Sequence, residues 1–315
     1  PGLISWICFL RGLWRLYYLI RKEQFDVVQT FSHYSNIIGP VVAWLAGVRV
    51  RVSSQRGSLR GSPKWLLYLD RLIANSFFVQ NMVAVSESTR QFSIKKQGIS
   101  ADKLITIRNG IDVAGCMQDF SETIEQLRLR LELPKDSKVV TTVARLSSQK
   151  GHRFLLEAIP EIIHIFPEAI FLFVGDGELM ETLKAQAEAE GIANVVRFLG
   201  VRKDVFALLA LSDVFVLPSL WEGLPNALLE AMAMGLSVVV TAVDGSAEVI
   251  ADEETGILVP PANVQALAEA ISRLLGDQEF RVRLGQAARE RVAQAFSEEK
   301  SIERFLAVYQ NLVGR

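Results

Sequence analysis

Residues 213–234 read Asp-Val-Phe-Val-Leu-Pro-Ser-Leu-Trp-Glu-Gly-Leu-Pro-Asn-Ala-Leu-Leu-Glu-Ala-Met-Ala-Met. The apolar run Asp213–Pro218 predicts a buried strand, and the apolar segment Asn226–Met234 predicts a helix. The turn between them carries Glu222, and a second carboxylate, Glu230, follows eight positions later. The stretch therefore predicts a strand, a turn and a helix, with a carboxylate on each side of the helix start.

The same pattern repeats along the chain from residue 139 onward. Short apolar runs bounded by Gly, Asp, Ser or Pro alternate with helix-like segments. Such alternation predicts a parallel sheet with right-handed crossovers, and ligands then bind beyond the carboxyl ends of the strands. The predicted strands are Val139–Ala144, Ala169–Val174, Val195–Leu199, Val214–Leu217 and Ser237–Thr241, and the predicted helices are His152–Ile165, Glu178–Glu190, Arg202–Leu211 and Asn226–Met234.

The first part of the chain shows the same alternation less completely. The turn-rich segment Arg108–Gly115 predicts a link between two domains. We expect a first domain over residues 1–115, a second over residues 116–297, and a C-terminal helix, residues 298–315, that completes the first. The predicted elements of the first domain are a helix over residues 3–22, the strands Asp26–Phe31, Val48–Ser53, Met82–Ser86 and Leu104–Ile107, and the final helix Glu298–Val313.

The composition is that of a globular protein, and the length of the chain suggests two domains. Of 315 residues, 50% are hydrophobic and 22% are charged, and this length exceeds that of a typical single domain. Two cysteines make no disulfide framework, so a reduced, cytoplasmic setting is expected. The apolar stretch Leu3–Ile20 is interrupted by Arg11 and Arg15, which makes it a poor membrane span.

The charges are divided unevenly along the chain. Residues 1–115 carry 15 Lys and Arg against 6 Asp and Glu, whereas the remainder carries 19 against 29. A basic half suits an anionic substrate, an anionic membrane surface or nucleic acid, and it also suits docking on the acidic half. Because no nucleic-acid motif accompanies the basic residues, nucleic acid is the weakest of these alternatives.

The helix start at Pro225 predicts an anion site. Proline suits a first helical position, and the free amides there, with the helix dipole, attract a phosphate. Glu230 lies roughly 7.5 Å further along the helix axis, within reach of a ribose attached to that phosphate. Glu222 would face a sugar on the other side. The alternative is a capped core helix with two solvated acids.

Other strand ends carry polar candidates. Arg145 and Lys150 follow one predicted strand and could clamp a diphosphate and stabilise charge on it, although both could also be ordinary surface cations. Residues 175–178, Gly-Asp-Gly-Glu, could line a nucleotide pocket or cap a helix, and His33 follows a strand as either a site residue or a structural one. Because no metal-ligand cluster, Asp-x-Asp motif or P-loop occurs, we expect neither a metal nor a bound cofactor.

Taken in order, these motifs resemble glycosyltransferase family 4, the retaining group 1 enzymes of the GT-B fold. That fold has two Rossmann-like domains whose parallel sheets face one another across a cleft. The motifs that carry the resemblance are Val83-Ala-Val-Ser-Glu-Ser-Thr-Arg90, Ile107-Arg-Asn-Gly-Ile-Asp112, Val143-Ala-Arg-Leu-Ser-Ser-Gln-Lys-Gly151, Phe173-Val-Gly-Asp-Gly-Glu178, Phe198-Leu-Gly200, the E-x7-E segment Pro218–Ala233 and Gly256-Ile-Leu-Val-Pro260.

The resemblance implies a role for each candidate. Arg145 and Lys150 would bind the donor diphosphate, Glu222 would contact the transferred sugar, and His33 would line the sugar side from the first domain. Glu230 would bind the ribose, the turn before it would cradle the diphosphate, and the segment after Phe198 would contact the base. The donor-binding residues implied in this way are Gly223, Leu224, Pro225, Asn226, Glu230, Val201 and Arg202.

The resemblance implies a metal-independent, retaining glycosyltransferase that moves a sugar from a nucleoside-diphosphate sugar to a saccharide or lipid-linked acceptor. The expected setting is polysaccharide or glycolipid synthesis at the inner face of the membrane. Arg11, Arg15, Arg21 and Lys22, together with Trp6, Trp14 and Tyr17, suit a membrane interface, although a core helix with a solvated face fits them equally. Family members begin with a further strand and a Gly-rich loop, so the first domain is expected to be incomplete. The alternatives are a nucleotide-sugar epimerase of the same fold and a non-catalytic nucleotide-sugar-binding protein.

Overall fold

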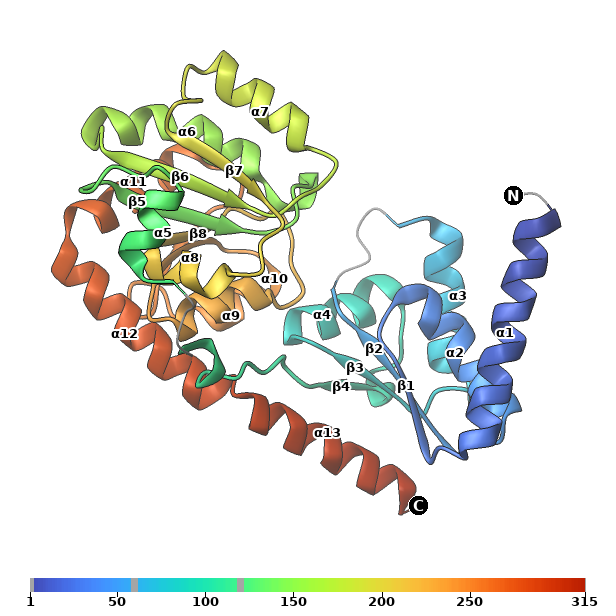
Figure 1. The fold of residues 1–315 in the computed structure, drawn as a ribbon. Coiled ribbons are helices and arrows are strands. Elements are labelled where there is room, and N and C mark those ends of the chain that lie inside the picture. The colour runs from blue at the N-terminus through green and yellow to red at the C-terminus, as the bar shows by residue number, and fades with distance from the viewer. Residues whose placement is uncertain (1–2, 58–61, 118–121, 315) are drawn as a thin grey trace. The chain divides into compact units, whose positions relative to one another are not determined.

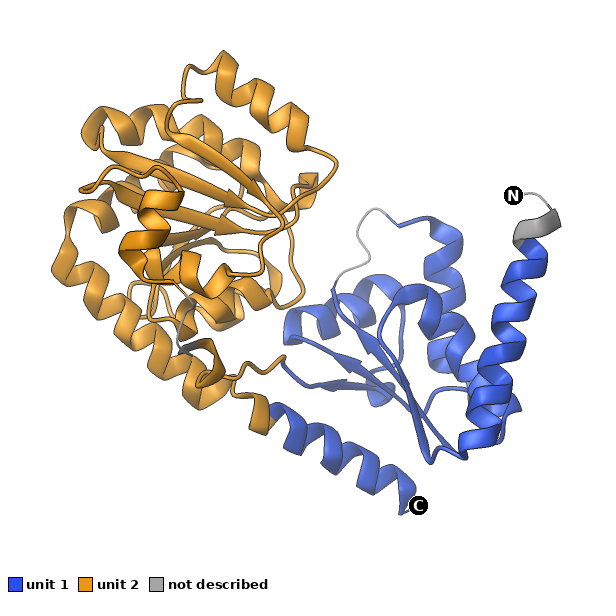
Figure 2. Ribbon diagram, viewed as in Figure 1, with its two compact units in different colours: residues 1–108, 301–315 blue, residues 109–300 orange. Residues whose placement is uncertain are grey.

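The computed structural model describes residues 3–57, 62–117 and 122–314, and Figure 1 shows their helices and strands. The chain divides into two compact units (Figure 2). Unit 1 contains residues 1–108 and 301–315, and unit 2 contains residues 109–300. Each unit holds one parallel sheet and its own core, so each is described by itself.

Unit 1 is built on a four-stranded parallel sheet in the order β1-β2-β3-β4. Along β2, Val50 and Val52 point to one face, where they pack against Val308 and Leu312 of the last helix, α13. The opposite face carries α1 and α2, which meet around Ile20. The elements are β1 (Val27–Thr30), β2 (Val50–Gln55), β3 (Asn81–Ala84), β4 (Leu104–Thr106), α1 (Leu3–Glu23), α2 (His33–Leu45), α3 (Lys64–Asn75), α4 (Glu87–Phe92) and α13 (Glu298–Val313).

Unit 2 is built on a six-stranded parallel sheet in the order β10-β9-β8-β5-β6-β7. Helix α6 packs beside α11, and α9 packs beside α12; Figure 1 shows these two pairs on opposite faces of the sheet. Phe171, Phe173 and Phe215 are fully buried between these layers. The elements are β5 (Lys138–Val143), β6 (Ala169–Val174), β7 (Val196–Gly200), β8 (Val214–Leu217), β9 (Ser237–Thr241), β10 (Ile257–Val259), α5 (Ile124–Arg130), α6 (His152–Ile165), α7 (Met180–Ala189), α8 (Val205–Leu211), α9 (Asn226–Ala233), α10 (Asp244–Val249), α11 (Val264–Gly276) and α12 (Gln278–Ala295).

The predicted α/β class and parallel sheets are confirmed, and most predicted elements end within two residues of the observed ones. Helix α7 starts two residues late because the amide of Leu179 donates to the carbonyl of Leu146, which ties the preceding turn to a neighbouring loop. Helix α8 starts three residues late because Arg202 binds Asp204 before the helix begins. Pro225 is the N-cap, with an extended ψ of 117°, and not the first helical residue.

Candidate functional site

Two loops at the carboxyl ends of neighbouring strands in unit 2 are joined to each other. The loop after β5 meets the loop after β8, where the amide of Leu220 donates to the carbonyl of Gln149 at 2.8 Å and Gln149 Nε2 donates to the carbonyl of Trp221 at 2.9 Å. Gly151 has a φ of +63°, and a Cβ there would lie 2.1 Å from the carbonyl oxygen of Pro218. Only glycine therefore allows the two loops to approach this closely.

Two of the predicted residues, Lys150 and Glu222, form a buried ion pair at this junction. Lys150 Nζ lies 2.5 Å from Glu222 Oε1, and the two side chains are 19% and 5% exposed. Ser219 Oγ donates to the same oxygen at 2.6 Å, and the amide of Glu222 donates to Asp244 Oδ2 at 3.1 Å. The carboxylate of Glu222 is thus buried and bound by Lys150 and Ser219, while Asp244 holds its backbone amide. The alternative of two solvated acids is wrong for Glu222, because its charge is compensated inside the protein.

Arg145, the other predicted cation, lies on the surface. Its side chain is 73% exposed, and its Nη2 lies 3.2 Å from Glu178 Oε2. Gly175 and Gly177 bring Glu178 to this position, because a Cβ on either would lie within 2.4 Å of a carbonyl oxygen of the loop after β5. Such an exposed pair contributes about 0–1 kcal/mol. The guanidinium is therefore able to turn toward an anion at little cost.

The turn that leads into α9 is buried as far as Pro225. Gly223, Leu224 and Pro225 are buried, whereas Asn226 is exposed. Asn109 Nδ2 donates to the carbonyl of Leu224 at 3.2 Å and to Asn226 Oδ1 at 2.8 Å. The link motif and the E-x7-E motif, more than a hundred residues apart in sequence, are thus connected within unit 2.

Glu230 lies one turn further along α9, on the wall of a pocket of about 380 Å³. Asn226, Asp112, Cys116 and Phe206 share this wall. Burial raises the pKa of the Glu230 carboxyl. Burial, with the nearby charges of Glu230 and Asp112, also raises the pKa of the Cys116 thiol, to about 11. Glu230 therefore faces a polar pocket that can accept hydroxyl donors.

The segment after β7 is separate from these contacts. Val201 is 79% exposed, and Arg202 is held by Asp204 at 2.8 and 2.5 Å. Asp204 also binds Arg130 at 2.9 Å. No hydrogen bond or ion pair between described residues joins Val201 or Arg202 to the other predicted site residues. Contact of these two residues with a base stays a prediction.

His33 belongs to unit 1, where it is the first residue of α2. Its side chain is half-buried. Burial lowers the pKa of the imidazole, and the neighbouring side chain of Gln55 opposes that shift. The imidazole is therefore neutral at neutral pH.

Sequence reasoning missed three residues that hold the site. Asp244, the first residue of α10, supports Glu222 and has an unusual φ of +37°. Asn109 comes from the link, and Cys116 follows the link directly. A non-glycine residue with positive φ has no signature in a single sequence, whereas the Asn-Gly-Ile-Asp motif does mark Asn109. Among residues 3–57, 62–117 and 122–314, no cluster of three or more His, Cys, Asp and Glu could hold a metal ion, and metal independence stays a prediction.

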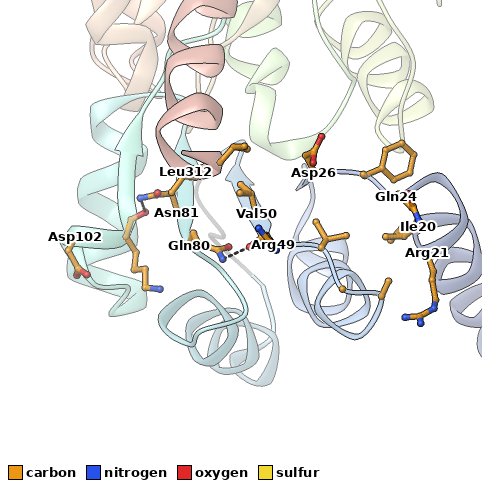
Figure 3. Close-up of a pocket in the computed structure, with 16 residues that line it drawn as sticks. Ile20, Arg21, Gln24, Asp26, Arg49, Val50, Gln80, Asn81, Asp102 and Leu312 are labelled. Carbon is orange, nitrogen blue, oxygen red and sulfur yellow. Dashed lines mark hydrogen bonds between the residues drawn. The ribbon is translucent and has the colours of Figure 1, made fainter. Parts of the chain in front are cut away.

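A larger pocket, of about 1010 Å³, lies in unit 1 at the amino ends of the strands (Figure 3). Arg49 and Val50 at the start of β2, and Gln80 and Asn81 at the start of β3, line it. None of the predicted site residues is in its wall. Because parallel sheets bind substrates at the carboxyl ends of their strands, this pocket is not the donor site.

Unit 2 is thus a parallel-sheet unit with cations and a buried carboxylate at its strand ends, beside the glycine-containing turn that starts α9. Residues 123–291 match the family described as Glycosyl transferases group 1, and residues 3–114 match that described as Glycosyltransferase Family 4. The chain belongs to the group 1 glycosyltransferases of family 4. The predicted family and the predicted glycosyltransferase activity are therefore confirmed.

Individual relatives agree with this assignment. The chain is 31% identical to UDP-Gal:alpha-D-GlcNAc-diphosphoundecaprenol alpha-1,3-galactosyltransferase of Escherichia coli, over 98% of this chain and 81% of the relative. It is 27% identical to N,N'-diacetylbacillosaminyl-diphospho-undecaprenol alpha-1,3-N-acetylgalactosaminyltransferase of Campylobacter jejuni, over 96% and 82%. The crystal structure of Anabaena HepE with UDP and glucose superimposes with a TM-score of 0.87 at 22% identity, over 95% of this chain and 81% of that one. The fold is GT-B, as predicted.

Among the described residues, no helix combines the length and the apolar character that crossing a membrane requires.

Proposed function

We propose that this enzyme transfers a sugar, with retention, from a uridine-diphosphate sugar to a saccharide carried on a lipid diphosphate. The E. coli relative uses UDP-Gal, and the E. coli and C. jejuni relatives both act on diphosphoundecaprenol-linked saccharides and form alpha linkages. The observation that carries the proposal is the buried contact of Lys150 with Glu222 beside the start of α9. This contact joins Lys150 of the motif after β5 to Glu222 of the E-x7-E segment.

Each donor group has a proposed partner in unit 2. The diphosphate binds the amides of Gly223 and Leu224 at the start of α9, where the helix dipole favours negative charge. Arg145 leaves its exposed partner to bind the same group. Glu230 accepts hydrogen bonds from the ribose, and Glu222 accepts them from hydroxyls of the sugar.

The remaining proposed assignments concern the base, the sugar and the proton. The base lies on the backbone around Val201 and Arg202, and His33 contacts a sugar hydroxyl. The leaving diphosphate is stabilised by Arg145, Lys150 and the helix start, without a metal. No side chain among the donor residues is assigned as a nucleophile. As the bond from the sugar to the diphosphate breaks and the bond to the acceptor oxygen forms, the departing diphosphate takes the proton of the acceptor hydroxyl.

Nucleotide titration tests the donor site. Calorimetry with UDP, GDP, ADP and dTDP should show saturable binding of UDP, weakened by Glu230→Ala and unaffected by Glu181→Ala, an exposed acid of the same unit. Preference for another nucleotide would replace the proposed donor. The absence of binding to the folded chain would favour a non-catalytic protein with an inherited fold.

Turnover tests the assigned chemistry. Arg145→Ala and Lys150→Ala should each lower kcat by about 10²-fold, as expected for a lost transition-state charge contact, and the exposed Lys184→Ala should not. A chelator such as EDTA should leave kcat unchanged. Conversion of the nucleotide sugar without any acceptor would instead identify an epimerase.

We also propose that unit 1 rests on an anionic membrane surface. Trp6 and Trp14 on α1 are largely exposed, and Trp14 stacks on Tyr18 with ring centroids 5.6 Å apart. Tyr17 does not belong to this exposed aromatic surface, because it packs against the core between α1 and α2. Exposed aromatic rings beside cations suit the headgroup region of a bilayer.

The cations of this surface continue into the pocket of Figure 3. Arg11 and Arg15 are exposed on α1, and Arg21 and Arg49 line the pocket. Flotation with vesicles of phosphatidylglycerol, compared with phosphatidylcholine, should show binding that Arg21→Gln/Arg49→Gln weakens. The pair Lys95→Gln/Lys96→Gln removes the same charge from exposed positions of unit 1 outside the pocket. Equal weakening by both pairs would reduce the proposal to diffuse attraction.

A further inference from the structure

A buried amide pair lies behind the carboxyl end of β2 in unit 1. Gln55, the last residue of β2, is fully buried, and Gln97, which ends the π-helix Ser93–Gln97, is 5% exposed. Gln55 Nε2 donates to Gln97 Oε1 at 3.1 Å. An amide buried without a partner costs about 1–3 kcal/mol. The contact between these distant residues therefore fixes the orientation of the Gln55 side chain.

The helix that carries His33 is fixed to the same strand ends. Asn36, three residues after His33, is buried, and its Nδ2 donates to the carbonyl of Ser54 at 3.0 Å. Its Oδ1 accepts from Thr30 Oγ1 at 2.7 Å. The first turn of α2 is thus attached to both β1 and β2, directly beside Gln55.

Two complementary atoms remain at this junction. His33 Nδ1 and Gln55 Oε1 are both buried, and neither has a partner that meets hydrogen-bond geometry. The contact of Asn36 with the carbonyl of Ser54 places the first turn of α2, which begins at His33, beside Gln55. A ring N–H is a donor and an amide oxygen is an acceptor, so the two atoms are chemically suited to pair with each other.

We infer that Gln55, itself held by Gln97, is a positioning residue that keeps His33 in the tautomer with the proton on Nδ1. In neutral histidine, the bond made by one ring nitrogen decides the state of the other. Nε2 is then unprotonated and accepts a hydrogen bond from a substrate hydroxyl. The role of His33 in sugar contact rests on the proposed function, whereas the tautomer does not.

Histidine NMR tests the inference without an activity assay. The chain contains three histidines, so a ¹⁵N-histidine-labelled sample gives three imidazole spin systems, and His33→Gln identifies the one from His33. In the unmodified enzyme, His33 should be protonated on Nδ1. Protonation of His33 on Nε2 would overturn the inference without any other variant.

Variants then test whether Gln55 sets the tautomer of His33. Gln55→Met removes the acceptor at similar size and should shift His33 toward protonation on Nε2. Gln55→Glu keeps an acceptor and should preserve the Nδ1–H form while it raises the pKa of His33, so the acid limb of a pH–rate profile moves to higher pH. Gln91→Met removes an amide that binds Glu87 instead and should change nothing. An unchanged His33 in Gln55→Met would overturn the inference.

The transfer reaction supplies the functional arm. Loss of one oriented hydrogen bond corresponds to up to about a tenfold fall, and Gln55→Met should show it in kcat with the KM for the donor unchanged. Gln97→Met should show a smaller fall in the same direction. If no transfer occurs with any acceptor, the proposed function fails while the NMR result still decides the tautomer. A normal kcat in Gln55→Met would remove its positioning role.

Discussion

Lys150→Met removes one partner of a buried ion pair and leaves the other behind. Removing one member of such a pair costs about 3–5 kcal/mol, because the remaining charge has been taken out of water. Glu222 is 5% exposed and Lys150 is 19% exposed, so water reaches the lysine side of the gap. Ser219 Oγ still donates to Glu222. We therefore expect a loss near the lower limit, about 3 kcal/mol.

Unfolding must be followed in unit 2 alone, because two compact units need not unfold together. Hydrogen exchange with mass spectrometry, measured against urea concentration on peptides of β5 and β8, gives the free energy of unfolding of that sheet. Lys184→Met is the matched control, since its pair with Glu181 is exposed and should contribute within about 0.5 kcal/mol. Lys150→Met combined with Glu222→Gln should cost less than the sum of the single changes. Equal effects at Lys150 and Lys184, or strict additivity, would refute the reasoning.

Three further predictions concern two buried titratable side chains and one glycine with positive φ. Burial raises the pKa of Asp70 from 3.8 to about 6, so the free energy of unfolding of unit 1 should fall by about 3 kcal/mol as the pH rises from about 4 to above 6. Asp70→Asn should abolish this fall, which urea midpoints measured against pH would show. Burial lowers the pKa of His152 from 6.5 to about 3, so unit 2 keeps its full stability above pH 6.5 and loses it as the pH falls; His152→Leu should flatten that acid limb. Gly151→Ala places a Cβ 2.1 Å from the carbonyl oxygen of Pro218, at a residue with positive φ. It should lower the free energy of unfolding by about 1–3 kcal/mol and weaken UDP binding measured by calorimetry. A variant of unchanged stability would show that the loops after β5 and β8 can separate.

The strands of unit 2 could be predicted because burial on both faces makes them continuous apolar runs. Ala169–Val174 and Ser237–Thr241 are confirmed residue for residue, as is the helix His152–Ile165. The starts of α7 and α8 were misplaced because the deciding contacts, Leu179 to Leu146 and Arg202 to Asp204, are made by single groups. Such contacts leave no periodic signal in the sequence.

Several residues of the candidate site could be predicted from the sequence, but the contacts between them could not. Lys150 and Glu222 could be named from their motifs, since strand ends and helix starts are recognisable. Their contact could not be predicted, because it depends on β5 and β8 being neighbours in the sheet order. Asp244, at the start of α10, and Asn109, in the link, support the same turn. These contacts arise from topology and not from local pattern.

The two predicted cations therefore differ in what it costs to recruit them. Arg145 shares an exposed pair with Glu178, which a diphosphate can replace at a cost of about 0–1 kcal/mol. Lys150 is bound to a buried carboxylate, and drawing it away would leave Glu222 uncompensated. In the proposed function, an incoming diphosphate gains most by binding Arg145 fully while Lys150 keeps its contact with Glu222. In the proposed function, the lysine then acts on both groups, because it attracts the phosphate and fixes the carboxylate that faces the sugar. Lys150→Ala should therefore reduce both stability and turnover, whereas Arg145→Ala should reduce turnover alone.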